Sequence, residues 1–246
     1  MTTLDPTSNP TEPAGLAAGR AATAGESLLT LFGGVWLIVG LFVDGYAHSE
    51  ILDAETEDFF TPWHGIFYSG FLFVTAVIGW IWLRRSGPST PAGWLPPGYG
   101  WSVVGLAVFA VGGIGDGIWH TVFGVETGID ALLSPTHLLL FVGMALILTT
   151  PLRAFWLDPG RGGAGPVSWS SAGGAVASTA IATALTGFFF VYAFGLDENW
   201  THRLPFDPVT EANENAVALG LATAYVGTMI LVVPVLGLLR RTDLPP

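Results

Sequence analysis

Six side chains of the types that bind metal ions recur at matched spacing in this 246-residue chain. In each set an aspartate is followed four residues later by a histidine, and a second histidine follows after a loop, two residues behind a proline. The two sets are Asp44, His48 and His64, and Asp116, His120 and His137. The aspartates lie 72 residues apart and the last histidines 73. Self-similarity at a fixed period indicates a duplicated structural unit.

The spacing predicts that each set converges on one point. Aspartate and histidine at i and i+4 share one face of a helix. Pro62 and Pro135, each preceded by an N-cap residue, suit the first turn of the next helix, which places His64 and His137 at its start. We therefore expect one carboxylate and two imidazoles to meet within about 4–5 Å, as ligands of one ion must.

Three protein ligands with an open position are typical of catalytic rather than structural metal sites. Mixed nitrogen and oxygen ligands suit Zn, Fe or Cu(II). The chain has no cysteine, which excludes disulfides and Fe–S clusters and disfavours Cu(I). Each loop also carries a glutamate, Glu55 or Glu126, that is a candidate to hold a histidine N–H or to add a ligand.

Two other interpretations of the motif stay open. The aspartates and histidines also suit a hydrogen-bond network that clamps each helical hairpin, and two of the histidines suit haem ligation. If both sets bind metal, a parallel repeat allows either two separate mononuclear sites or one dinuclear centre. The fifth histidine, His202, is read as an ordinary loop residue.

The elements that carry these residues are transmembrane helices. The chain is 51% hydrophobic and only 11% charged, whereas a soluble domain has about 25% charged residues. Six apolar runs are long enough to span a bilayer, at residues 27–48, 62–83, 99–122, 135–155, 170–192 and 215–239. The fold class is therefore an all-α integral membrane protein of three helical hairpins, the first two forming an internal parallel repeat.

Basic residues predict the orientation of these spans. Seven arginines fall on one side and only Arg203 on the other; the seven are Arg20, Arg84, Arg85, Arg153, Arg161, Arg240 and Arg241. By the positive-inside rule both termini are cytoplasmic and the metal sites face outside. The expected segments are a disordered cytoplasmic tail (1–25), hairpin 1 (26–84), a cytoplasmic linker (85–98), hairpin 2 (99–156), a second linker (157–169), hairpin 3 (170–241) and a short tail (242–246). The absence of lysine suggests a prokaryotic plasma membrane.

The six ligand positions resemble the metal site of the C subunit of copper membrane monooxygenases, in which an Asp-x-x-x-His pair and a later histidine bind metal in the outer part of a helical bundle. The matching residues are Asp44, His48 and His64, and again Asp116, His120 and His137. The last gap is 15 or 16 residues here and 12 in that family. The resemblance implies copper and oxidoreductase chemistry.

We therefore expect a metal-dependent oxidoreductase, or its metal-binding subunit, acting on a small apolar or lipid substrate. The alternatives are a metal-dependent hydrolase, a protein that captures metal without catalysis, and a structural subunit. Aromatic residues near the motif are candidates to line a pocket: Tyr46, Phe59, Phe60, Phe67 and Phe123. The lipid bilayer is the expected surrounding, with a membrane complex or further copies of the chain as candidate partners. A net charge of −11 excludes a general nucleic-acid binder.

Overall fold

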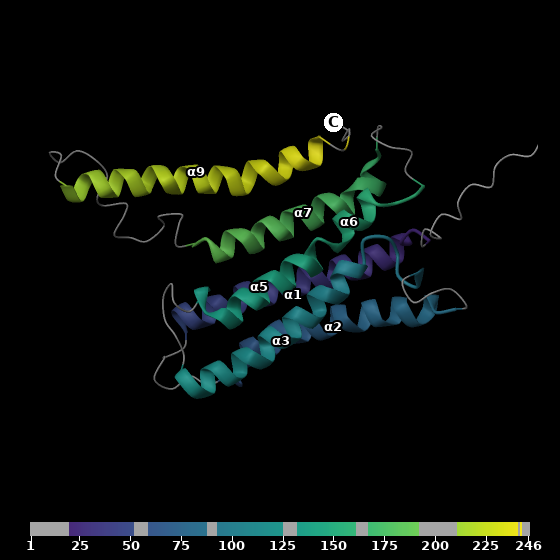
Figure 1. Ribbon diagram of the computed structural model, residues 1–246, viewed down its shortest axis with the longest axis horizontal. Coiled ribbons are helices and arrows are strands. Elements are labelled where there is room, and N and C mark those ends of the chain that lie inside the picture. Colours follow the sequence, from purple (N-terminus) through teal and green to yellow (C-terminus); the bar gives the residue numbers. More distant parts are fainter. Residues whose placement is uncertain are drawn as a thin grey trace, which may run out of the picture.

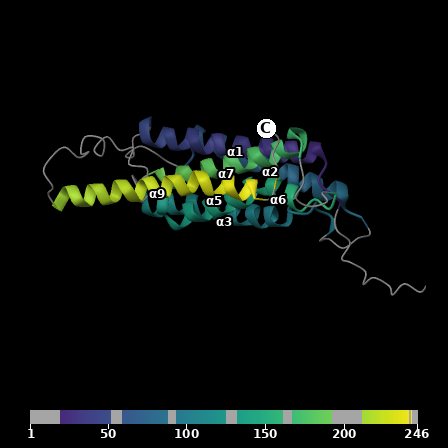
Figure 2. The same ribbon diagram turned by 90° about the horizontal axis from the view of Figure 1, so that it is seen from above.

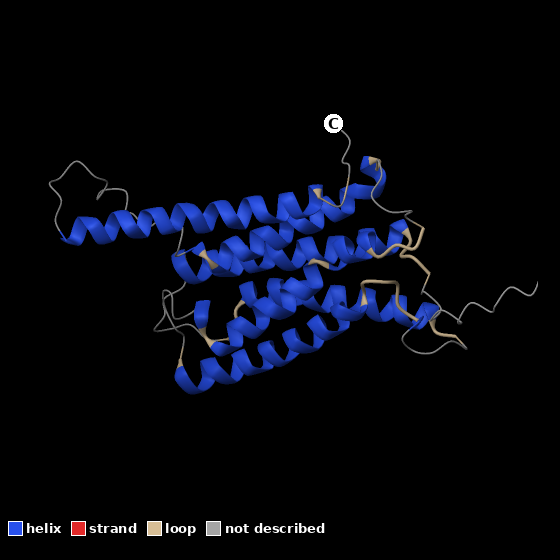
Figure 3. Cartoon of the chain, turned by 45° about the horizontal axis from the view of Figure 1, so that its top comes forward, coloured by secondary structure: helices blue, strands red, loops and turns tan. Residues whose placement is uncertain are grey.

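The protein is an elongated bundle of helices in the computed structural model (Figures 1 and 2). The structure describes residues 20–51, 59–87, 93–124, 132–160, 167–191, 211–240 and 242, and in 211–220 the backbone alone. The helices are α1 (Ala24–Glu50), α2 (Pro62–Arg85), α3 (Gly100–Phe123), α5 (Pro135–Leu148), α6 (Thr150–Trp156), α7 (Trp169–Phe189) and α9 (Glu211–Leu239). No strand occurs among the described residues (Figure 3).

The prediction of six membrane spans is confirmed by length and composition. Six helices are long and apolar enough to cross a membrane, with α5 and α6 together forming one of them. Their outward surfaces carry many exposed large hydrophobic side chains. Such a surface is costly in water and is expected in lipid, where helices satisfy their own backbone groups.

Glycines bring the helices of the first two pairs into close contact. α1 packs along α2, and α3 packs along α5. A Cβ added at Gly40 would lie 2.7 Å from the Cα of Phe67, so backbone there touches backbone. The matching glycine of the second pair, Gly112, lies against Leu140, which is the repeat equivalent of Phe67.

The same correspondence holds at two further contacts. In each helix pair a glycine of the first helix lies against the second helix, and a glycine of the second helix lies against the first. The residues involved are at equivalent positions of the repeat. These are Gly33 on Val74 and Gly105 on Ile147, then Gly70 on Leu37 and Gly143 on Phe109. Small residues at such positions permit close helix packing in membranes. The first two helix pairs are therefore packed alike, residue by residue.

The fourth span differs from the prediction because it is broken. α5 ends at Leu148 and α6 begins at Thr150, one residue before Pro151. Proline has no N–H and clashes with the carbonyl four residues earlier, here that of Ile147. The Thr150 hydroxyl donates to the Ile147 carbonyl at 2.6 Å, and the Ser178 hydroxyl of α7 donates to the Leu148 carbonyl at 2.6 Å. The freed backbone groups are thus satisfied within the bundle, as a membrane interior requires.

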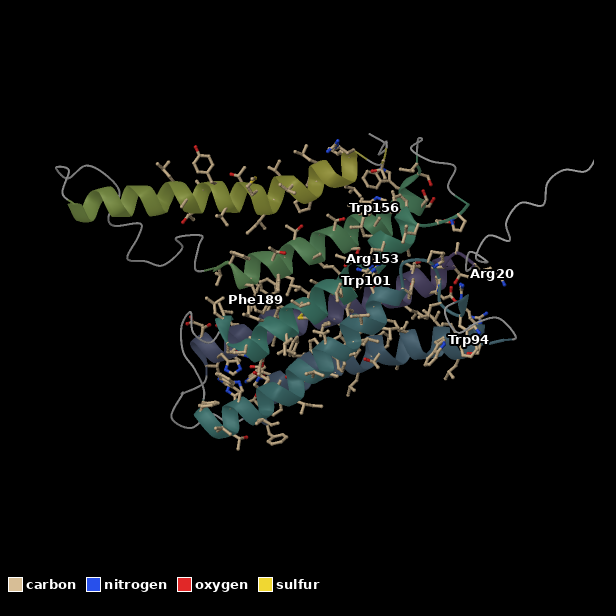
Figure 4. All side chains as sticks on the ribbon, viewed as in Figure 1. Arg20, Trp94, Trp101, Arg153, Trp156 and Phe189 are labelled. Atoms are coloured by element: carbon tan, nitrogen blue, oxygen red, sulfur yellow. The ribbon has the colours of Figure 1, made fainter. Side chains whose placement is uncertain are left out.

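Arginines gather at one end of the bundle. Figure 4 shows Arg20 at the right-hand end of the bundle and Arg153 further in, between that end and the middle. At that end Arg85 pairs with the buried Glu26, and its Nε donates to that carboxylate at 2.9 Å. The last helix, α9, packs against α7 and lies on the far side of α7 from α2 and α3 (Figure 1). The candidate metal ligands occupy the opposite end from the arginines.

Candidate metal centre

Helix ends place all six predicted ligands at one end of the bundle. Asp44 and His48 lie in the last turns of α1, and Asp116 and His120 in the last turns of α3. The predicted caps are present in the second helix of each pair. Thr61 accepts a hydrogen bond from the backbone N–H of His64 at 3.2 Å, and Ser134 accepts one from that of His137 at 3.3 Å. His64 and His137 therefore occupy the first turns of α2 and α5.

The predicted convergence is present in both sets. One ligand atom from each of Asp44, His48 and His64 lies within 4.8 Å of the others, and the same holds for the second set. In the first set the Nε2 atoms of His48 and His64 lie 3.7 and 3.5 Å from the Asp44 carboxylate. In the second set the Nε2 of His120 lies 3.6 Å, and that of His137 3.1 Å, from Oδ1 of Asp116, the other candidate carboxylate.

Three of these four distances match ligands of one ion better than they match hydrogen bonds. An N–H···O bond has a length of about 2.7–3.2 Å. Two atoms that are each about 2.1 Å from a tetrahedral ion lie about 3.4 Å apart. The distances of 3.5, 3.6 and 3.7 Å lie near the second value, and only the His137–Asp116 pair has hydrogen-bond length.

Two of the histidines are held through their other ring nitrogen. The Nδ1 of His120 lies 3.4 Å from the carbonyl oxygen of Gly124, which can only accept a hydrogen bond. The Nδ1 of His64 contacts the Thr61 hydroxyl at 3.2 Å. Backbone or hydroxyl partners of this kind are typical of metal-ligating histidines.

The two sets are neighbours and form one cluster. The ring centroids of His64 and His120, which belong to different sets, lie 6.4 Å apart. Within the second set the rings of His120 and His137 lie 5.9 Å apart, so the separation between sets is nearly the same as within one. His48 also interacts electrostatically with Asp116 of the other set. The two candidate ligand groups therefore lie side by side at the interface of the two helix pairs.

The cluster has a closed side and an open side. The His64 and His120 side chains are 8% and 7% exposed, whereas those of His48 and His137 are each 25% exposed. Phe59 covers the closed side, stacked on His64 at 5.0 Å between centroids and 6.4 Å from His120. A small molecule would approach the cluster from the side of His48 and His137.

Some predicted neighbours of the cluster are not at it. Of the aromatic candidates Phe59 contacts two ligands, and Phe67 is a buried core residue. Tyr46, Phe60 and Phe123 are 61%, 88% and 67% exposed, so they do not line a pocket in the cluster. The candidate partners Glu55 and Glu126, together with His202, lie outside the described residues.

Two polar residues at the cluster were not predicted. Thr136 donates to Oδ1 of Asp116 at 3.1 Å, and its repeat equivalent is Trp63, which has no hydroxyl. Tyr68 lies one turn beyond His64 on α2, and its ring is 6.1 Å from that of His64. Because residues at i and i+4 share a helix face, the position of Tyr68 was a usable signal.

Comparisons with protein-family models, curated proteins and solved structures find no match for this chain. The resemblance to copper monooxygenase C subunits therefore rests on the six ligand positions alone. The findings define two buried Asp/His/His groups in a multi-span helical protein.

Proposed function

We propose that the protein is a membrane metalloprotein whose two Asp/His/His sets bind two transition-metal ions in one dinuclear centre. The observation that carries this proposal is the spacing between carboxylate and imidazole atoms. At 3.5–3.7 Å, three of the four pairs are too far apart for good hydrogen bonds and suitably spaced for a shared ion. Of the four carboxylate–imidazole pairs, His137–Asp116 has the hydrogen-bond length that a network clamping the hairpins would favour.

The closeness of the two sets favours one centre over two independent sites. Two-metal sites hold their ions about 3.5–4 Å apart. The ring centroids of His64 and His120, which belong to different sets, are 6.4 Å apart, a distance compatible with two neighbouring ions. Nitrogen and oxygen ligands suit Cu(II), Fe or Zn, and the chain has no cysteine to supply a thiolate ligand.

The chemistry that this centre supports best is that of an oxidoreductase, or of its metal-binding subunit. Three protein ligands for each ion leave coordination positions free, as in catalytic sites. The apolar surroundings suit a small apolar or lipid substrate. The same open geometry also serves a hydrolase or a protein that captures metal without catalysis.

We propose that the centre faces the outside of a prokaryotic plasma membrane. The chain then crosses the bilayer as three hairpins, with the helix pairs α1–α2 and α3–α5 as a parallel repeat and both termini in the cytoplasm. Support comes from the arginines at the end of the bundle opposite the cluster, such as Arg20, Arg85 and Arg240.

Metal content tests the proposed function. Protein purified in mild detergent without chelator, then offered Cu, Zn and Fe, should hold about two ions per chain by elemental analysis. His64→Ala and His137→Ala should each lose most of the metal if the centre is shared, because losses at coupled sites are not additive. Independent sites would leave about one ion in each single variant. Background metal in the wild type would overturn the proposal.

A further inference from the structure

Tyr68 carries a hydroxyl group that the fold buries beside the metal ligands. The residue lies on α2, four residues after His64, so its side chain is on the same helix face one turn deeper in the bundle. Its ring packs against Phe67 at 5.2 Å and against Phe109 of α3 at 5.9 Å. The hydroxyl oxygen is buried and has no partner in normal hydrogen-bond geometry among the described residues, although the Asp116 carboxylate is near enough to interact with it.

A glycine on α3 makes room for this hydroxyl. A Cβ at Gly113 would lie 2.8 Å from Cε1 and 3.2 Å from the hydroxyl oxygen of Tyr68. Gly113 precedes Asp116 by three residues and so lies on the same helix face. The hydroxyl is close enough to Asp116 and Asp44 to interact electrostatically with both carboxylates. The phenol therefore lies at the inner floor of the cluster, between the two ligand sets.

A buried phenol without a partner costs free energy that a hydrogen bond would recover. In the proposed centre both carboxylates bind ions, and the contact of Tyr68 with Asp116 does not reach normal hydrogen-bond geometry. Each proposed ion keeps free coordination positions at which a small ligand can bind. We propose that Tyr68 donates a hydrogen bond to a small ligand bound at the metal centre, one with an accepting atom such as a small anion. This inference rests on the proposed metal-binding function.

The second helix pair shows which residue occupies the position of Tyr68 when no hydroxyl is present. The residue equivalent to Tyr68 in the second helix pair is Phe141, which has the same ring without the oxygen. Phe141 packs on Phe189 at 4.7 Å, so a phenylalanine suits this helix position. Tyr68 therefore has no equivalent hydroxyl in the second helix pair. In the proposed centre this single hydroxyl donates to a ligand that both ions share.

Azide binding to the Cu(II)-loaded protein tests the role of Tyr68. Azide accepts hydrogen bonds, and its binding to Cu(II) is followed by visible absorption. Tyr68→Phe should keep the wild-type copper content and bind azide about tenfold more weakly, because a hydrogen bond to a charged acceptor is lost. Tyr46→Phe is the matched control, since Tyr46 is 61% exposed, and it should bind azide like the wild type.

Two results would overturn the role of Tyr68. Unchanged azide affinity in Tyr68→Phe at full copper content would show that the hydroxyl does not contact the ligand. Loss of copper from a folded Tyr68→Phe would show that Tyr68 is itself a metal ligand. If that variant does not fold, Tyr68→Leu, which also lacks the hydroxyl, must give the same weakening of azide binding. A wild type without metal would instead overturn the proposed function itself.

Discussion

Replacing Gly40 by alanine should weaken metal binding, although Gly40 is not itself a metal ligand. The new Cβ would lie 2.7 Å from the Cα of Phe67, whereas ordinary contacts begin at 3.4 Å. Because both partners are helix backbone, α1 and α2 must separate locally by about 0.7 Å, the difference between those two distances. Gly40 is one turn from Asp44, and Phe67 is one turn from His64, so the displacement reaches the first ligand set.

The size of the effect follows from the ligand spacing. Moving Asp44 and His64 apart by 0.7 Å would lengthen their 3.5 Å separation to about 4.2 Å. Two ligands at about 2.1 Å from one ion can be at most about 4.2 Å apart, and then only with the ion in line between them. We expect copper or zinc affinity to fall about tenfold or more, which is about 1.4 kcal/mol.

Gly79→Ala is the matched control for this experiment. Gly79 is also in α2, and a Cβ there meets nothing within 4 Å. The control should leave affinity unchanged and, by helix propensity, stabilise the protein by up to about 1 kcal/mol. Competition with a chromogenic chelator measures affinity, and thermal unfolding in detergent measures stability. Wild-type affinity in a folded Gly40→Ala protein would refute the claim that these helices set the ligand spacing.

Three further predictions concern pH, packing and topology. Metal content should fall as the pH drops from about 6 to 4, since protonated imidazoles cannot bind metal; retention at pH 4 would argue against histidine ligands. Ser178→Ala should lower stability by about 1 kcal/mol by leaving the Leu148 carbonyl without its donor, yet keep the metal; loss of metal would contradict this separation of roles. Reporter fusions at Asp53 and Gly163 should report opposite sides of the membrane, and the same side for both would end the proposed topology.

The helices and the two ligand sets could be predicted because their signals are local. Apolar runs of span length predict helices, and Thr61 and Ser134 before proline predict where α2 and α5 begin. The repeat adds independent support, since the same side chains occur twice. Gly33 and Gly40 could also have been predicted as packing residues, because each has an equivalent glycine 72 residues later, the same spacing as that of the two aspartates.

Other features depend on contacts that are distant in sequence. The break at Thr149 was missed because Pro151 lies near the end of an apolar run, and the donor that stabilises the break, Ser178, comes from another helix. The closeness of His64 to His120 depends on how one helix pair packs on the other. Tyr68 was missed because a tyrosine in an apolar run is usually a packing residue, although its position four residues after His64 was a signal.

Electron paramagnetic resonance of the Cu(II)-loaded protein tests the central claim most directly. With two Cu(II) ions per chain held by Asp44, His48, His64 and their repeat equivalents, the two spins should be coupled. The spectrum should then contain a half-field transition and fewer isolated Cu(II) spins than elemental analysis counts. Two uncoupled Cu(II) signals that account for all the copper would contradict a single dinuclear centre.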